Sequence, residues 1–262
     1  MGKSRLLLNL AILLIMGSAS ALPAQGLTPD DAGINEKLGA QAALDAVLKD
    51  EDGKEITLRQ LTTKPTVLTL NYFRCAGICT PLLNGLVDTL NQMALEPGRD
   101  YQVVTVSFDP TDTPEVAHQK RINYLRQMKR PFPPAGWRFL TGDARNTREV
   151  TDSVGFKFRA ADDGFIHPGV IVVLTPKGIV SRYLYGIHFL PADLQMAIQE
   201  AAKGQVRPTI SQVLSFCYSY DPEGRRYVFS MTRAVGAATL LLAGGWVVYL
   251  LTAGRWRRKA RS

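Results

Sequence analysis

Two cysteines stand between a strand-like segment and a helix-like segment, and this order constrains the fold more than any other feature of the chain. Residues 66–73 are rich in Val, Leu, Thr and aromatic side chains, as in a strand that is buried in a sheet. Cys75 and Cys79 follow, and the apolar residues of 81–93 then recur at helical spacing. The sequence therefore predicts a strand, a turn containing two cysteines and a helix in direct succession.

Strand and helix patterns continue to alternate along the chain. Asp52-Gly53 predicts a hairpin within residues 48–58, and Thr113-Pro114 predicts the start of a helix that runs through Tyr124. The remaining predicted elements are strands at 101–108 and 137–140, a helix at 145–154, two strands around a Pro-Gly turn within 170–180, and a helix at 191–203. The order β-α-β-α-β-β-α predicts an α/β domain with a mixed sheet flanked by helices, consistent with a thioredoxin-like fold.

Both ends of the chain carry signals for a membrane. Basic residues, an apolar stretch from Leu6 to Met16 and a small-residue pattern before Leu22 predict a secretory signal peptide, with an uncleaved N-terminal anchor as the alternative. Residues 234–253 contain no charged residue, are long enough to cross a bilayer, and are followed by a basic cluster. The positive-inside rule then places the C-terminus in the cytoplasm and the body of the chain outside, which in a bacterium is the periplasm.

These signals divide the chain into predicted parts and predict a single-pass protein of the inner membrane. The parts are a signal peptide at 1–21, a linker at 22–40, a thioredoxin-like domain at 41–205, a juxtamembrane segment at 206–232, a transmembrane helix at 233–253 and a basic cytoplasmic tail at 254–262. Of the net charge of +8, the first part carries +2 and the last carries +5, which leaves +1 for the rest. Because the body is nearly neutral, we expect no nucleic-acid partner.

The spacing of Cys75 and Cys79 brings their sulfurs within reach of each other or of one ion. A helix N-terminus favours the thiolate, which both metal binding and disulfide exchange require. Two thiolates with one imidazole suit copper, whereas a structural zinc site usually has four protein ligands. His167, which precedes a strongly apolar strand, is the candidate imidazole. The residues alone are also compatible with His167 as an ordinary hydrogen-bonded histidine, and with an inert disulfide between Cys75 and Cys79. His118 and His188 are expected to have no role in a site.

Three motifs, taken together, resemble the Sco/SenC family of copper chaperones for cytochrome c oxidase assembly, over roughly residues 40–205. They are Cys75-x-x-x-Cys79, the run Ser107 to Pro114, which is similar to Ser-x-Asp-Pro-x-x-Asp-Thr-Pro, and His167 before an apolar strand. The resemblance implies a thioredoxin-like fold, with Cys75, Cys79 and His167 as ligands of Cu(I) and/or Cu(II). It also implies delivery of copper to the dinuclear copper site of a respiratory cytochrome oxidase, with its copper-accepting subunit as the partner.

An alternative activity uses the same sulfurs. Cys75 and Cys79 would then be the redox pair of a thiol-disulfide oxidoreductase that keeps the metal-binding cysteines of the partner reduced. This would make the protein an enzyme, whereas a metallochaperone turns over no substrate.

The chain departs from the family pattern at several points. Thr80 precedes Pro81 where the family usually has Cys-Pro, and Ile166 stands where the family often has Asp before the histidine. The predicted anchor is C-terminal, whereas many members have an N-terminal one.

Three further residues carry open interpretations. Asp109 and Asp112 are expected to initiate the helix at Pro114 rather than to shape the copper loop or contact a partner. Cys217 makes the cysteine count odd, and is a packed core thiol, a further ligand or resolving thiol, or an intermolecular link.

Overall fold

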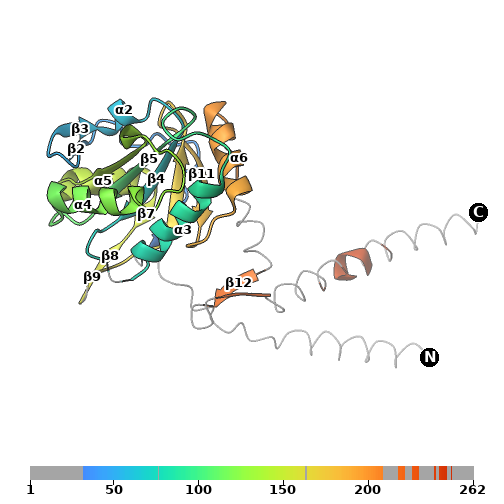
Figure 1. The fold of residues 1–262 in the computed structure, drawn as a ribbon. Coiled ribbons are helices and arrows are strands. Elements are labelled where there is room, and N and C mark those ends of the chain that lie inside the picture. The colour runs from blue at the N-terminus through green and yellow to red at the C-terminus, as the bar shows by residue number, and fades with distance from the viewer. Residues whose placement is uncertain are drawn as a thin grey trace, which may run out of the picture. The chain divides into compact units, whose positions relative to one another are not determined.

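A five-stranded sheet is the centre of the fold (Figure 1). The structure is a computed structural model that describes residues 32–75, 77–162 and 164–208, together with 218–221, 226–229, 239, 242–246 and 249. The strands, in spatial order, are β11 (Val180–Tyr185), β10 (Val170–Leu174), β4 (Thr66–Asn71), β5 (Gln102–Ser107) and β6 (Trp137–Leu140). β4, β5 and β6 are parallel, and β10 is antiparallel to both β4 and β11. The predicted mixed α/β sheet is therefore confirmed.

Helices cover both faces of this sheet. They are α2 (Leu58–Leu61), α3 (Cys79–Gln92), α4 (Pro114–Leu125), α5 (Ala144–Ser153) and α6 (Pro191–Ala202), with a 3₁₀ turn η1 (Pro134–Gly136) before β6. Alternate residues of β4 face opposite sides of the sheet, where two hydrophobic clusters form the core. Val67 belongs to the cluster that includes residues of α3, α4 and α6. Leu68 and Leu70 belong to the cluster that includes residues of α5. A strand that is buried on both faces reads as a continuous apolar run, which is why β4 was predictable.

Short strand pairs supplement the sheet. β2 (Val47–Lys49) and β3 (Glu55–Thr57) form the predicted hairpin, with Gly53 at a positive φ of 79°. β8 (Arg159–Ala161) and β9 (Gly164–Ile166) form a second hairpin, which the sequence did not predict. β1 (Gly33–Ile34) pairs with β7 (Phe156–Lys157), so residues 33–34 of the predicted linker 22–40 take part in regular structure.

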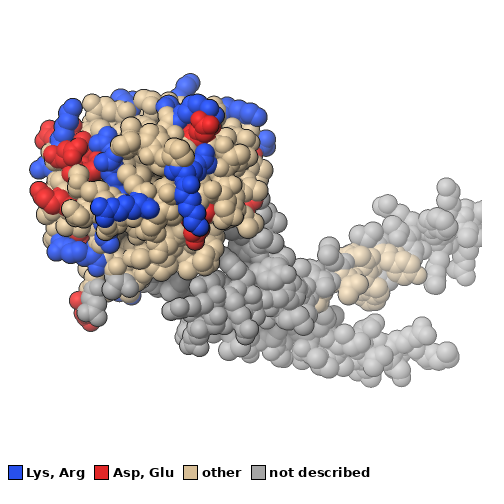
Figure 2. Space-filling model, in the orientation of Figure 1, with Lys and Arg blue, Asp and Glu red and all other residues tan. Residues whose placement is uncertain are grey.

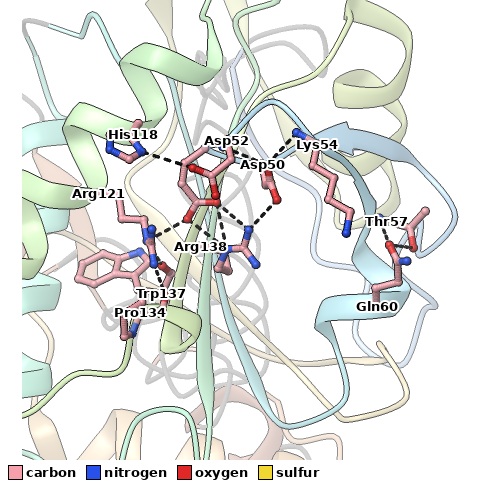
Figure 3. Close-up of polar contacts among 11 residues, drawn as sticks. Asp50, Asp52, Lys54, Thr57, Gln60, His118, Arg121, Pro134, Trp137 and Arg138 are labelled. Atoms are coloured by element: carbon pink, nitrogen blue, oxygen red, sulfur yellow. Dashed lines mark hydrogen bonds and ion pairs between the residues drawn. The ribbon is translucent and has the colours of Figure 1, made fainter.

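The β2–β3 hairpin is joined to the sheet by a network of ion pairs (Figure 3). The Glu51 carboxylate, whose side chain is 0% exposed, lies 2.9 Å from the guanidinium groups of both Arg121 on α4 and Arg138 on β6. Arg138 also pairs with Asp50 at 2.9 Å. The backbone N–H of Asp52 donates to the Asp50 carboxylate and so shapes the hairpin turn. The contacts of Arg138 connect segments that are about ninety residues apart in the chain.

The N-terminal part of the domain also lies along both edges of the sheet. Lys49 and Thr141, just after β6, exchange two backbone hydrogen bonds at 2.7 and 2.9 Å. At the other edge Gln41 forms a bridge with Ile179, and the Val180 N–H donates to the Ala40 carbonyl. The domain surface in view carries interspersed acidic and basic side chains (Figure 2).

The predictions for the two ends of the chain fall largely outside the described residues. These include the signal peptide 1–21, the tail 254–262, most of the transmembrane segment 233–253, and Cys217. Within the predicted juxtamembrane segment 206–232, β12 (Tyr218–Asp221) and β13 (Arg226–Phe229) form an antiparallel pair. Among the residues that are described, no helix has the length and apolar character needed to cross a membrane.

Candidate metal centre

The backbone that leads into Cys75 is fixed by a buried carboxylate. Asp112, whose side chain is 0% exposed, accepts hydrogen bonds from the Phe73 N–H at 2.6 Å and from the Ser107 hydroxyl at 2.7 Å. The Arg74 guanidinium, which is half exposed, donates to the same carboxylate at 3.2 Å. The two residues before Cys75 are therefore held to the loop between β5 and α4.

This contact corrects the expectation that Asp112 serves only to initiate a helix. α4 does begin at Pro114, with Thr113 as its N-cap. The carboxylate of Asp112, however, turns back to the cysteine loop. Asp109 has the more local role, because its carboxylate accepts hydrogen bonds from the N–H and hydroxyl of Thr111 within the same loop.

The two cysteines lie on either side of the start of α3, and neither is in a disulfide. Cys79 is the first residue of the helix, two residues earlier than the predicted start, and is 4% exposed. Cys75 lies in the preceding loop, is 9% exposed, and accepts a hydrogen bond from the Gly77 N–H at 3.3 Å. The predicted strand, cysteine turn and helix are thus present.

His167 follows β9 and is enclosed by aromatic rings. Its imidazole is 5.8 Å from the ring of Tyr72, 5.3 Å from that of Phe108 and 5.9 Å from that of Phe156, measured between ring centroids. The residue is 9% exposed. Rings on three sides restrict the orientation of the imidazole and limit the access of water.

Hydrogen bonding directs one ring nitrogen of His167 at the cysteines. Nδ1 lies 3.1 Å from the Pro168 carbonyl, which can only accept, so the proton belongs on Nδ1. Nε2 then carries the lone pair and lies 3.1 Å from the Cys79 sulfur. Burial lowers the pKa of His167, with the Pro168 carbonyl acting in the opposite direction. The imidazole is therefore neutral at pH 7, which is the form that binds metals.

The ligand atoms of Cys75, Cys79 and His167 all lie within 4.8 Å of one another. The structure thus brings together the three residues that were predicted as ligands. Two sulfurs and one imidazole nitrogen are soft to borderline donors, which fits copper better than the hard ions that prefer oxygen. Neither of the other histidines belongs to this group: His118 pairs with Asp52 at 3.8 Å, and His188 is exposed.

The two thiols differ in acidity. Burial acts to raise the pKa of Cys75, but hydrogen bonds from the Cys79 thiol, the Tyr72 hydroxyl and backbone N–H groups outweigh it, so that the pKa lies below its ordinary value. Burial raises the pKa of Cys79, and its hydrogen bond with Cys75 raises it further. Near neutral pH Cys75 is thus the more reactive sulfur, and Cys79 keeps its proton.

Alkylation of the dithiol protein should therefore modify Cys75 first. At pH 7 we expect iodoacetamide to modify Cys79 more than about tenfold more slowly, because only the thiolate reacts and each unit of pKa changes its fraction tenfold. The rate at Cys75 should rise with pH and reach half its maximum below pH 9.0, the ordinary value for a thiol. Time-resolved peptide mapping by mass spectrometry measures both rates and separates them from that of Cys217. Equal rates at the two sites would contradict this assignment.

Apolar side chains border the three residues. Ile78 is 37% exposed and Ile166, where the family often has Asp, is 44% exposed. A Cβ on Gly169 would lie 2.9 Å from Ile78 Cδ1, so the backbone after His167 packs closely on the start of α3. Sequence reasoning missed Tyr72, since an aromatic residue at the end of an apolar strand gives the same signal as a core residue.

Comparisons with known proteins agree on one family. The model of the SCO1/SenC family matches residues 38–203. A SCO1 protein homolog from Bacillus subtilis (strain 168) is 25% identical over 150 residues, which cover 55% of this chain and 74% of that protein. A solved structure from Aquifex aeolicus VF5 is 29% identical, with a TM-score of 0.58, and the match covers 64% of this chain and 96% of that one.

A more distant structure shares the fold. BsSco, a member of the Sco family of cytochrome c oxidase assembly proteins, is 20% identical with a TM-score of 0.51, over 64% of this chain and 97% of that one.

Proposed function

Because this chain belongs to the SCO1/SenC family, we propose that it is a metallochaperone that binds copper through Cys75, Cys79 and His167 and delivers it to the dinuclear copper site of a respiratory cytochrome oxidase. The observation that carries the proposal is the approach of two sulfurs and one imidazole nitrogen to within 4.8 Å in a buried site.

The geometry suits an ion that is held and then passed on. Three protein ligands leave a coordination position for a ligand from a partner. Cys75 lies in the loop before α3 and is 9% exposed, whereas Cys79 begins the helix and is 4% exposed, and His167 is enclosed by rings. An incoming thiolate or imidazole can therefore replace Cys75 first, and the ion moves by exchange of one ligand at a time.

The recipient and the location belong to the same proposal. The copper-accepting subunit of a respiratory oxidase is the partner that family membership supports, and BsSco belongs to a family of cytochrome c oxidase assembly proteins. The signal-like residues 1–21, the uncharged segment within 233–253 and the basic tail 254–262 support a single-pass protein of the inner membrane, with the domain in the periplasm.

Copper titration of the full chain in detergent tests the function. We expect about one copper per chain, with X-ray absorption showing two sulfur ligands and one nitrogen ligand. His167→Ala should weaken binding by more than about tenfold, because even residues that only support a ligand cost that much. His188→Ala, at an exposed histidine outside the site, is the control and should bind as the parent does. A His167→Ala protein with unchanged affinity and spectrum would rule out the three-ligand site.

A second function is favoured by the unequal thiols. A more acidic Cys75 next to a protonated Cys79 is the arrangement of an attacking and a resolving thiol, and suits reduction of the cysteines of a partner. Turnover of a disulfide substrate by copper-free protein separates this oxidoreductase from the chaperone, which should show no useful rate.

A further inference from the structure

Of the three proposed ligands, Cys75 has the least support from regular structure. Cys79 is the first residue of α3, and His167 is enclosed by aromatic rings. Cys75 lies in the loop between β4 and α3, and its N–H donates to the Tyr72 carbonyl over 3.4 Å, which is longer than a typical hydrogen bond. The position of the Cys75 sulfur therefore depends on what holds the residues before it.

The end of the parallel ladder between β4 and β5 is formed by a side chain. Asn71 pairs with Ser107, and the Phe108 N–H donates to the Asn71 carbonyl at 2.9 Å. In a parallel ladder every second residue of a strand donates to its neighbour, so the next donor after Asn71 is the Phe73 N–H. Its acceptor is the Asp112 carboxylate, at 2.6 Å, in place of a backbone carbonyl. Asp112 thus fixes the point at which the chain leaves the sheet for the cysteine loop.

This hydrogen bond is buried, and the oxygen that accepts it is itself held. The Asp112 side chain is 0% exposed, and the same oxygen, Oδ2, accepts from the Ser107 hydroxyl at 2.7 Å. Water cannot easily take the place of a buried acceptor, and a buried N–H without a partner is costly. The backbone of Phe73 is therefore constrained to stay next to Asp112.

The other oxygen of Asp112 holds the next residue of the chain. Oδ1 accepts from Arg74 Nε at 3.2 Å, and Arg74 Nη2 donates to the carbonyl and the hydroxyl of Thr111 at 2.7 and 2.6 Å. The Arg74 side chain is 58% exposed, so solvent screens its ion pair with Asp112. The buried bond to Phe73 is therefore the stronger of the two constraints on the chain before Cys75.

We propose that Asp112 is a positioning residue that sets where the Cys75 sulfur lies relative to Cys79 and His167, by holding Phe73 at the end of the sheet. This rests on the copper site proposed above, because the three ligand atoms must converge on one ion. Without the carboxylate, residues 73–75 lose their attachment to the loop between β5 and α4. Cys75 is then the ligand that leaves the ion, while Cys79 and His167 keep their own supports.

Asp112→Ala removes the acceptor, and copper titration with X-ray absorption on the full chain in detergent measures the result. We expect copper affinity to fall by more than about tenfold, as for other residues that hold a metal ligand in place. The spectrum should change from two sulfur ligands to one, with the nitrogen ligand retained. Asp112→Asn keeps one oxygen that can accept from Phe73, and should therefore lose less affinity and retain both sulfurs.

Glu51→Ala is the matched control for a loss of stability. Glu51 is also a carboxylate with a 0% exposed side chain, but its ion pairs connect the β2–β3 hairpin to α4 and β6. This variant should keep the copper affinity and the two sulfur ligands of the parent. The proposal is overturned if Asp112→Ala binds copper as the parent does, or if Glu51→Ala loses a sulfur ligand equally.

A measurement without copper separates this proposal from the chaperone function. Dibromobimane becomes fluorescent when it bridges two thiols that lie close together, and peptide mapping distinguishes a Cys75–Cys79 bridge from products of Cys217. In the copper-free full chain, Asp112→Ala should form the bridge more slowly than the parent, and Glu51→Ala should match the parent. Equal rates in Asp112→Ala and the parent overturn the proposal. A parent that binds no copper but forms the bridge faster than Asp112→Ala refutes the chaperone function and supports the positioning role.

Discussion

Glu51→Ala should destabilise the domain by about 3 kcal/mol, which is the lower end of the cost of removing one partner from a buried ion pair. The Glu51 side chain is 0% exposed and neutralises two arginines, Arg121 and Arg138, whose side chains are only 15% and 19% exposed. Without the carboxylate, Asp50 is left as the acidic partner of Arg138. The lower end applies because both guanidinium groups keep some contact with water.

Urea unfolding followed by circular dichroism measures this loss, and the melting temperature should fall by roughly 6–12 °C. Asp45→Asn is the control, since it breaks the ion pair between Asp45 and Arg59, whose side chains are 76% and 60% exposed. Solvent screens such a pair, so this variant should unfold close to the parent. Equal effects of the two substitutions would show that the network in Figure 3 contributes no more than a surface ion pair.

Gly85→Ala should also destabilise the domain, by about 2 kcal/mol or more, although alanine is the better helix former. In the interior of a helix alanine is favoured over glycine by up to about 1 kcal/mol. A Cβ on Gly85, however, would lie 1.8 Å from the backbone oxygen of Ile187 and 2.9 Å from its carbonyl carbon. A backbone oxygen cannot rotate away as a side chain can. Overpacking of this kind typically lowers the free energy of unfolding by about 1–3 kcal/mol.

Asn84→Ala provides the matched test, because Asn84 is the exposed neighbour of Gly85 on α3. It should leave stability unchanged or raise it slightly. A Gly85→Ala protein as stable as Asn84→Ala would mean that α3 can move away from the loop before α6 at no cost. Because α3 begins at Cys79, such a movement would also displace one of the proposed copper ligands.

The long elements were predictable because each has enough residues to show a period. β4 is buried on both faces, which leaves a continuous apolar run in the sequence. α3 is buried on one face, which leaves apolar residues at helical spacing. The hairpin at Gly53 was predictable from its turn residues. β1, β7, β8 and β9 have two or three residues each, too few for a pattern, and β1 pairs with β7 across more than a hundred residues of chain.

The site was predictable in part for similar reasons. Cys75 and Cys79 are marked by residue type and by position between a strand and a helix. His167 gives no such local signal, and only the family resemblance separated it from an ordinary histidine. The contacts of Asp112 with Phe73, and of the Tyr72 ring with the His167 ring, depend on tertiary structure alone, since both Asp112 and Tyr72 have an ordinary local explanation.

The bridges at residues 41 and 49 bear on how the two edges of the sheet are covered. An open sheet ends in two strands with unpaired backbone groups, which can template the addition of a strand from another molecule. Here Thr141 and Ile179, next to the two outer strands, are already bridged by Lys49 and Gln41 from one N-terminal stretch of the domain. The short stretch from residue 41 to residue 49 therefore covers part of both edges of the sheet. A chain in which this stretch had not yet packed onto the sheet would expose both edges to pairing with another molecule.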